Sequence, residues 1–210
     1  MDIFRRIGSQ FRKPSGTLGT IISDLMILGN RSAYKTLIKE LTLDPNDKIL
    51  EIGYGPGIGI GFISKRFESC DIYGIDFSEL MFRRASKRNS QLIKNNKVHL
   101  FLGDFIKTEI NTVNFSVIYC INVIYFWDDL QKPFEKVRSL LRDEGIFCFY
   151  MARNEDLTKV RFTRNDIFNK YSIEQITDAL TSAGFSEVEY NFKHGYFIKA
   201  KNKLQTNAPA

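Results

Sequence analysis

The stretch Lys48–Gly59, KILEIGYGPGIG, joins a short apolar run to four glycines at alternate positions. Lys48–Ile52 predicts a strand, and the spacing of apolar residues through Phe62–Phe67 predicts a following helix. Glycine permits a sharp turn and lets bare backbone approach a ligand where a Cβ atom would collide. A glycine turn between a strand and a helix therefore predicts a ligand site at the carboxyl end of the first strand. A glycine-rich turn without a ligand is the alternative.

Beyond this turn, short β-type runs alternate with longer helical ones. Ser78 is the expected N-cap of the first of the later helices. Strands that alternate with helices predict βαβ units and a parallel sheet with helices on both faces. The expected strands are Asp71–Asp76, Val98–Leu102, Phe115–Val123 and Gly145–Met151, and the expected helices are Ser78–Lys94 and Leu130–Leu141.

The two ends of the chain depart from this alternation. A helix is predicted over Ser172–Ala183, followed by strands Phe185–Phe192 and Tyr196–Ala200, whose close spacing indicates an antiparallel hairpin. At the other end, Leu18–Leu28 and Arg31–Leu41 predict two helices that pack over one end of the sheet. We therefore expect an N-terminal helical lid (1–42), a ligand-binding domain (43–201) and a flexible tail (202–210).

Two acidic residues narrow the choice of ligand. The spacing GxGxG differs from the dinucleotide fingerprint GxGxxG, and Glu51 stands two residues before the first glycine. A carboxylate in the turn would repel a pyrophosphate, whereas it suits an ammonium group or a neutral ribose. Asp76 ends the second strand, where a carboxylate can accept hydrogen bonds from two vicinal ribose hydroxyls. Together these residues favour an adenosine ligand.

Four motifs resemble those of the class I S-adenosylmethionine-dependent methyltransferases, in the same order. They are ILEIGYGPGIG, YGIDFS, LGDF at Leu102–Phe105 and CINVIYFW at Cys120–Trp127. The resemblance covers roughly Asp44 to Lys201 and is greatest to small bacterial methyltransferases of the type-11 kind. It implies a Rossmann-like three-layer α/β sandwich whose seven-stranded sheet is mostly parallel and ends in an antiparallel C-terminal hairpin. It also implies S-adenosyl-L-methionine as the cofactor.

The resemblance assigns roles to individual positions. Phe77 and Met81 would flank the adenine, Asp104 would accept from its amino group beside Phe105, and Asp76 would hold the ribose. Asn122 matches the position of backbone contacts to the methionine portion. The loop around that portion would be formed by Glu51, Gly53, Gly55 and Gly57. Pro56 is one departure from the family pattern, although Gly-Pro-Gly is common in this subgroup. His99 is another, since many relatives have a different residue there, and a packed position within a strand is expected for it.

Methyl transfer depends mainly on alignment of the acceptor, with water excluded, and needs a base only where the acceptor must lose a proton. Acceptor-side residues should therefore follow the fourth strand. Tyr125 is our candidate for contact with the acceptor, and a core aromatic is the alternative for it. No Asp/Asn-Pro-Pro-Tyr/Phe motif follows the predicted fourth strand, and a Pro-Cys pair is lacking, so the signatures of nucleobase methylation are missing. The lid segments, the first 40 residues and Arg153–Tyr171, are short, which favours a small-molecule acceptor methylated on oxygen or nitrogen.

Composition and charge limit the class of protein. The 210 residues are 43% hydrophobic and 26% charged, as in one globular domain. The net charge of +6 indicates either an anionic partner or simply a soluble surface. The three scattered cysteines and two histidines predict neither a disulfide framework nor a metal site. No signal peptide or membrane span is expected, so the predicted location is cytoplasmic.

Basic residues gather in two places. One is the expected helix after Asp76, where a solvated face and a phosphate track are both open interpretations. The other is the N-terminal arm, whose Arg5, Arg6, Arg12 and Lys13 precede an apolar segment. This arm is either a lid or a contact with an anionic membrane surface. Nucleic-acid binding is not expected, because an aromatic stacking platform is lacking.

Three other functions stay open beside methyl transfer to a small molecule. They are a lipid-headgroup methyltransferase at a membrane surface, a NAD(P)-binding oxidoreductase, and a non-catalytic protein of the same fold. Binding of a nicotinamide cofactor would indicate the oxidoreductase, and the GxGxG spacing with Glu51 speaks against it.

Overall fold

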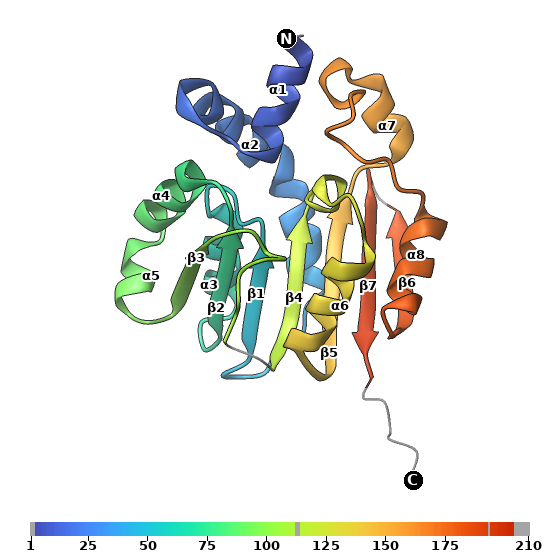
Figure 1. The fold of residues 1–210 in the computed structure, drawn as a ribbon. Helices are drawn as coiled ribbons and strands as arrows, with labels where there is room; N and C mark the ends of the chain where they lie inside the picture. The colour runs from blue at the N-terminus through green and yellow to red at the C-terminus, as the bar shows by residue number, and fades with distance from the viewer. Residues whose placement is uncertain (1–2, 112–113, 193, 204–210) are drawn as a thin grey trace.

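The fold is built on one seven-stranded sheet with the strand order β3-β2-β1-β4-β5-β7-β6 (Figure 1). The computed structural model describes residues 3–111, 114–192 and 194–203. The first five strands are parallel, and β7 runs antiparallel to both of its neighbours. The expected mostly parallel sheet with an antiparallel C-terminal hairpin is confirmed. The strands are β1 (Lys48–Ile52), β2 (Asp71–Asp76), β3 (Val98–Leu102), β4 (Phe115–Ile121), β5 (Leu141–Met151), β6 (Phe185–Phe192) and β7 (Tyr196–Asn202).

Helices cover both faces of the sheet. The C-terminal part of α2 packs with α3 and α4 on one face, and α6 and α8 pack on the other. The helices α1, α7 and the start of α2 lie beyond the carboxyl ends of the parallel strands (Figure 1). The helices are α1 (Ile3–Arg12), α2 (Gly16–Glu40), α3 (Ile58–Arg66), α4 (Glu79–Arg88), α5 (Ser90–Lys94), α6 (Gln131–Leu140), α7 (Asn154–Lys159) and α8 (Ile173–Ser182), with 3₁₀ turns η1 (Ile124–Phe126) and η2 (Arg161–Thr163).

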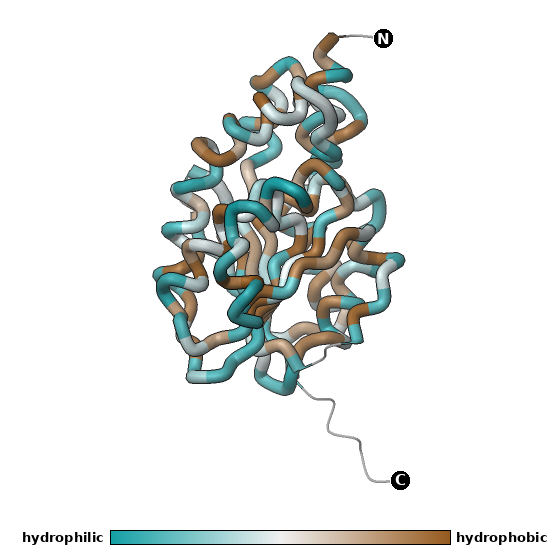
Figure 2. Tube along the Cα trace, turned by 90° about the vertical axis from the view of Figure 1, so that its left-hand side faces the viewer, coloured by the Kyte–Doolittle hydropathy of each residue, from teal (hydrophilic) through white to brown (hydrophobic). Residues whose placement is uncertain are grey.

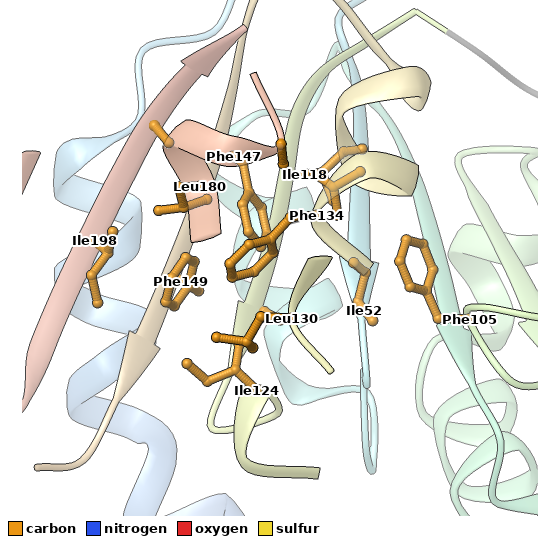
Figure 3. Close-up of a cluster of buried hydrophobic side chains, with 14 of the residues drawn as sticks. Ile52, Phe105, Ile118, Ile124, Leu130, Phe134, Phe147, Phe149, Leu180 and Ile198 are labelled. Carbon is orange, nitrogen blue, oxygen red and sulfur yellow. The ribbon is translucent and has the colours of Figure 1, made fainter. Parts of the chain in front are cut away.

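The core on the α6 and α8 face is rich in phenylalanine. Phe134 of α6 packs on Phe147 and Phe149 of β5, with ring centroids 5.6 and 6.1 Å apart, and all three side chains are fully buried. Figure 3 shows these rings together with Leu180 of α8 and Ile198 of β7. Figure 2 shows hydrophobic stretches through the middle of the molecule and hydrophilic loops at the end away from the N-terminus. Buried aromatic area of this kind dominates the stability of such a domain.

The N-terminal region differs from the expectation. The two predicted helices, Leu18–Leu28 and Arg31–Leu41, form one continuous helix, α2, and a further helix, α1, precedes it. Gly29 and Asn30, between the two predicted helices, have low helix propensity. Burial of Ile22 before them and of Leu37 after them holds the helix through this point. Tertiary packing therefore outweighs local propensity here.

Several boundaries of the later elements also differ from the prediction, among them the start of β5, which lies at Leu141 rather than at Gly145. Strand β4 ends at Ile121, two residues early, because Asn122 has a left-handed backbone with a φ of 56°. The predicted helix Ser78–Lys94 is divided at Asn89, whose Nδ2 donates to the carbonyl oxygens of Gly57 and Ala85, each at 3.0 Å. The expected tail begins later than residue 202, because β7 includes Asn202. Residues 204–210 of that tail lie outside the described residues.

The two segments expected to form the lid contact each other at the carboxyl end of the sheet. Phe11 of α1 stacks on Phe162 of η2 with ring centroids 4.8 Å apart, and Arg5 pairs with Asp166 at 2.8 Å. Within the described ranges, no helix combines the length and apolar character needed to cross a bilayer.

Candidate active site

A cleft lies at the carboxyl ends of β1 to β4, beneath α1 and the first part of α2. It contains about 980 Å³ of empty space including its open mouth. Its lining comes from the glycine loop, the ends of β2, β3 and β4, the turn η1 and the two N-terminal helices. The cleft therefore brings together the segments that carry the sequence motifs.

Glycines in the loop after β1 allow a left-handed backbone, and at Gly53 they also avoid a collision with a neighbouring side chain. Gly53, Gly55 and Gly57 all have positive φ values of 72°, 52° and 75°. A Cβ atom at Gly53 would come within 2.6 Å of Val123, whereas one at Gly55 would meet only open space. Both residues line the cleft. Gly57 lies behind the loop against Ala85 and Asn89, so the structure places it outside the cleft lining.

Asp76 is a buried carboxylate on the cleft wall. Its Oδ2 accepts from the Gly55 N–H and its Oδ1 from the Ser78 N–H, both at 2.9 Å. Only 8% of the residue is exposed, and burial raises its pKa to about 6 against the lowering effect of the two N–H groups. Each oxygen keeps a lone pair for a further donor. The group is therefore suited to accept from two neighbouring hydroxyls of a ligand.

Glu51 lies beneath the glycine loop rather than in the cleft. Its Oε1 accepts from the hydroxyl of Tyr34 at 2.6 Å, and its Oε2 accepts from the hydroxyl of Tyr119 at 2.8 Å. The residue is fully buried, and this burial raises its pKa to about 7, although both hydroxyls act in the opposite direction. The structure thus places Glu51 as the support of the loop, one layer behind the position expected from the motif.

The expected adenine-side residues line one wall of the cleft. Phe77, Met81, Asp104 and Phe105 all contribute to it. Ser78 caps α4 by accepting from Met81 N, and Asp104 Oδ1 accepts from the Ile106 N–H at 2.9 Å. Asp104 is exposed, in contrast to buried Asp76.

Asn122 and Tyr125 belong to one hydrogen-bonded chain, but only Asn122 reaches the cleft. The Tyr125 hydroxyl donates to Asn122 Oδ1 at 2.8 Å and accepts from the backbone N–H of Ala152. Asn122 Nδ2 donates to Asn30 Oδ1 at 2.9 Å. Tyr125 is 3% exposed and does not line the cleft, so the structure places it behind Asn122 rather than against an acceptor.

Residues of the first two helices complete the cleft, and the motifs did not identify them. No sequence motif marked Asn30, which lies between the two predicted helices. The residues contributed by this region are Phe11, Arg12, Pro14, Met26, Ile27, Asn30 and Tyr34.

Two side chains, one on α4 and one at its N-cap, attach the N-terminal region to this helix. Ser78 Oγ donates to the carbonyl oxygen of Pro14 at 2.7 Å, and Arg84 donates to the carbonyl oxygen of Thr20 at 3.0 Å. Arg84 also donates to Ser23 Oγ at 2.6 Å and pairs with Asp24. One member of the basic cluster on this helix therefore has a structural role.

Other groups considered from the sequence lie apart from the cleft. His99 stacks on Tyr73 with ring centroids 4.6 Å apart, as expected for a packed residue within a strand. Cys70, Cys120 and Cys148 are free and buried. In the described part of the chain, no three metal-binding side chains are grouped as they would be in a metal site.

Comparisons with known proteins agree with this geometry. Residues 50–147 match a family described as "Methyltransferase domain". The chain is 25% identical over 170 residues to the uncharacterized methyltransferase YdaC of Bacillus subtilis, covering 81% of this chain and 88% of that protein. It is 28% identical to the sterol 24-C-methyltransferase of Kluyveromyces lactis, covering 76% of this chain but only 44% of the relative.

A solved structure has the same fold at low identity. It is phosphoethanolamine N-methyltransferase 2 of Haemonchus contortus in complex with S-adenosyl-L-methionine, with a TM-score of 0.69 and 16% identity. The match covers 83% of this chain and 53% of that one. The matched domain and the fold support a class I S-adenosylmethionine-dependent methyltransferase, with S-adenosyl-L-methionine as the cofactor.

Proposed function

We propose that this enzyme transfers a methyl group to an oxygen or nitrogen atom of a small molecule bound in the cleft. The observation that carries the proposal is the mixed lining of the cleft. It includes Asp76 and Asp104 beside the glycine loop, and it also includes apolar and aromatic side chains of the N-terminal helices and η1. The acids and the loop suit an adenosyl ligand, and the apolar side chains suit the body of an acceptor.

The residues present fit the cofactor. In this proposal Asp76 accepts from the ribose hydroxyls, Asp104 accepts from the adenine amino group, and Phe77, Met81 and Phe105 form the apolar surroundings of the ring. The open space beside Gly55 supports close approach of a ligand to the loop. Glu51 and Gly57 take supporting roles in the same loop. When bound, S-adenosyl-L-methionine supplies an electrophilic methyl group on a sulfonium sulfur.

The chain's own residues would orient the acceptor and exclude water. Phe11, Phe126 and Trp127 line the cleft beneath the covering helices. Alignment and exclusion of water account for much of the rate of such a displacement. Tyr125, in this scheme, positions Asn122 and is not itself in contact with the acceptor.

The names of relatives do not decide the acceptor, because they refer to different atoms. One relative is named for methylation of a sterol carbon and another for methylation of the nitrogen of phosphoethanolamine. A screen of small alcohols, acids and amines for release of S-adenosylhomocysteine tests the proposal. Turnover of at least one small oxygen or nitrogen acceptor is the expected result. Turnover confined to membrane-embedded lipid, with no small soluble acceptor, would refute it.

A further inference from the structure

The hydrogen-bonded chain that ends at Asn30 has a defined direction. A backbone N–H can only donate, so the N–H of Ala152 makes the Tyr125 oxygen an acceptor at one end. The Tyr125 hydroxyl hydrogen is therefore directed to Asn122, whose Oδ1 lies 2.8 Å away. The Nδ2 of Asn122 then donates to Asn30 Oδ1 at 2.9 Å.

This direction determines what Asn30 presents to a ligand. Its carbonyl oxygen is occupied by Asn122, while its amide nitrogen carries two hydrogens to donate. Asn30 is half-buried and lines the cleft. The site thus offers a donor whose orientation is set three hydrogen bonds away, at the main chain of Ala152.

The cleft lining also carries charge. Among the described residues that line it, the charged ones are Arg12, Asp76 and Asp104. The two acids lie at the ends of β2 and β3, beside the region proposed for adenosine. Arg12 ends α1 and is the basic residue of this lining, which also includes the apolar side chains of Phe11, Met26, Ile27 and Phe126.

We propose that Asn30 and Arg12 select an acceptor that joins an apolar body to an anionic oxygen, of which a carboxylate is the simplest case. The Asn30 amide donates to that oxygen and Arg12 supplies the matching charge, while the apolar side chains bind the body. This inference rests on the proposed function, because it names the substrate class of the same cleft.

The chemistry of a carboxylate acceptor balances without any further reactant. An acceptor oxygen forms a bond to the methyl carbon while the carbon–sulfur bond breaks, and that electron pair passes to sulfur. The negative charge of the acceptor and the positive charge of the sulfonium disappear together, and the products are a methyl ester and a thioether. A carboxylate is already deprotonated at neutral pH, so no proton has to be removed.

Trp127 provides a binding signal that does not depend on turnover, because it is the only tryptophan of the 210 residues and lines the cleft. The probes are octanoate and octylamine, which share an apolar body and differ in charge. Titration of the protein without cofactor should show saturable fluorescence change with octanoate and at least about tenfold weaker binding of octylamine. Equal or tighter binding of octylamine would overturn the proposal.

Asn30→Asp tests the direction of the donor. It retains an oxygen for Asn122 but replaces the donating amide by a second acceptor, so octanoate binding should fall about tenfold or more and the preference should shift toward octylamine. Ser32→Asp adds the same charge to an exposed position of α2 and is the matched control. Arg12→Gln should also weaken octanoate binding, whereas Arg6→Gln on the exposed side of α1 should not. Unchanged octanoate binding in Asn30→Asp would overturn the proposal.

A second arm distinguishes the acceptor from the carboxylate of the cofactor. S-adenosylhomocysteine carries that carboxylate, and 5′-methylthioadenosine lacks the amino-acid end. Asn30→Asp should leave the affinities of both within about threefold of the wild-type values. A selective loss of S-adenosylhomocysteine binding would assign Asn30 to the cofactor and refute the inference. Failure of the proposed function would appear separately, as the absence of turnover in the acceptor screen.

Discussion

The hydroxyl of Tyr34, on the helix α2, lies 2.6 Å from Oε1 of Glu51, on the first strand of the sheet. This bond connects the helix that covers the cleft to the base of the glycine loop. Glu51 is fully buried, and its other oxygen is bound by Tyr119 at 2.8 Å. The helix α2 is therefore part of the domain's interior as well as the cover of its cleft.

Loss of the Tyr34 hydroxyl should destabilise the whole domain. Tyr34→Phe leaves one oxygen of a buried carboxylate without its donor, so the free energy of unfolding should fall by about 1–3 kcal/mol. Urea unfolding followed by circular dichroism measures the change. Tyr190→Phe, on the exposed part of β6, is the control and should differ little from wild type. Equal stability of the two variants would show that the Tyr34–Glu51 bond contributes nothing.

Stability should also depend on pH through Glu51. Its pKa in the folded chain is about 7, above the ordinary value of 4.5, because burial penalises the charged form. A raised pKa means that the folded state binds the proton more tightly than the unfolded state. Its contribution to stability is therefore present in full below about pH 4.5 and is lost as the pH rises through about 7.

The comparison of wild type with Glu51→Gln isolates this effect. Between about pH 5 and about pH 7.5 the unfolding free energy of the cofactor-free wild type should decrease by about 1–3 kcal/mol more than that of the variant. Asp76, whose pKa is raised to about 6, adds a fall in the same direction to both proteins. Parallel pH profiles for the two proteins would contradict the assignment of a raised pKa to Glu51.

Arg84 should hold the first part of α2 over the cleft. Arg84→Gln weakens the contacts with Thr20, Ser23 and Asp24, so amide hydrogen exchange in residues 16–30 should become faster and S-adenosylhomocysteine should bind about threefold or more weakly. Arg83→Gln alters the neighbouring exposed arginine, which pairs only loosely with Glu79 at 3.6 Å, and is the matched control. Unchanged exchange in Arg84→Gln would show that α2 is held without this side chain.

Tyr125→Phe distinguishes a positioning role from contact with the acceptor. Without the hydroxyl, Asn122 loses a donor and the N–H of Ala152 loses an acceptor, so the orientation of Asn122 is no longer defined. We expect weaker binding of S-adenosylhomocysteine, by about threefold to tenfold, together with a loss of stability of about 1–3 kcal/mol. Tyr196→Phe, on β7, is the control. Loss of turnover with unchanged cofactor affinity and stability would instead support direct action on the acceptor.

The sequence allowed the fold to be predicted where local patterns and long-range packing agree. The limits of β2, β3 and β6 were predicted to the residue, because apolar runs there are bounded by turn residues. The prediction of two separate helices within α2 was wrong, since the local apolar spacing does not show that Ile22 and Leu37 are both buried by tertiary packing. The end of β4 was placed late because Val123 is apolar, while the left-handed backbone of Asn122 is not visible in a sequence pattern.

The site was predictable to the extent that it follows the ends of strands. The motifs led to Asp76, Asp104, Gly53 and Gly55, all of which the structure brings to one cleft. Asn30 and Arg12 come from helices far away in the sequence, and only tertiary packing places them beside these residues. For the same reason, the motif that includes Glu51 could not indicate that Tyr34 and Tyr119 would enclose its carboxylate beneath the loop.

The most direct test of the proposed site is calorimetric titration of S-adenosylhomocysteine into the wild type, Asp76→Asn and Asp71→Asn. Asp71 begins the strand that Asp76 ends and forms an ion pair with Lys97 away from the cleft, so it is a matched control. The wild type and Asp71→Asn should bind alike, and Asp76→Asn should bind at least about tenfold more weakly while its unfolding transition stays cooperative. Unchanged affinity in a folded Asp76→Asn protein would contradict the placement of the ribose at Asp76.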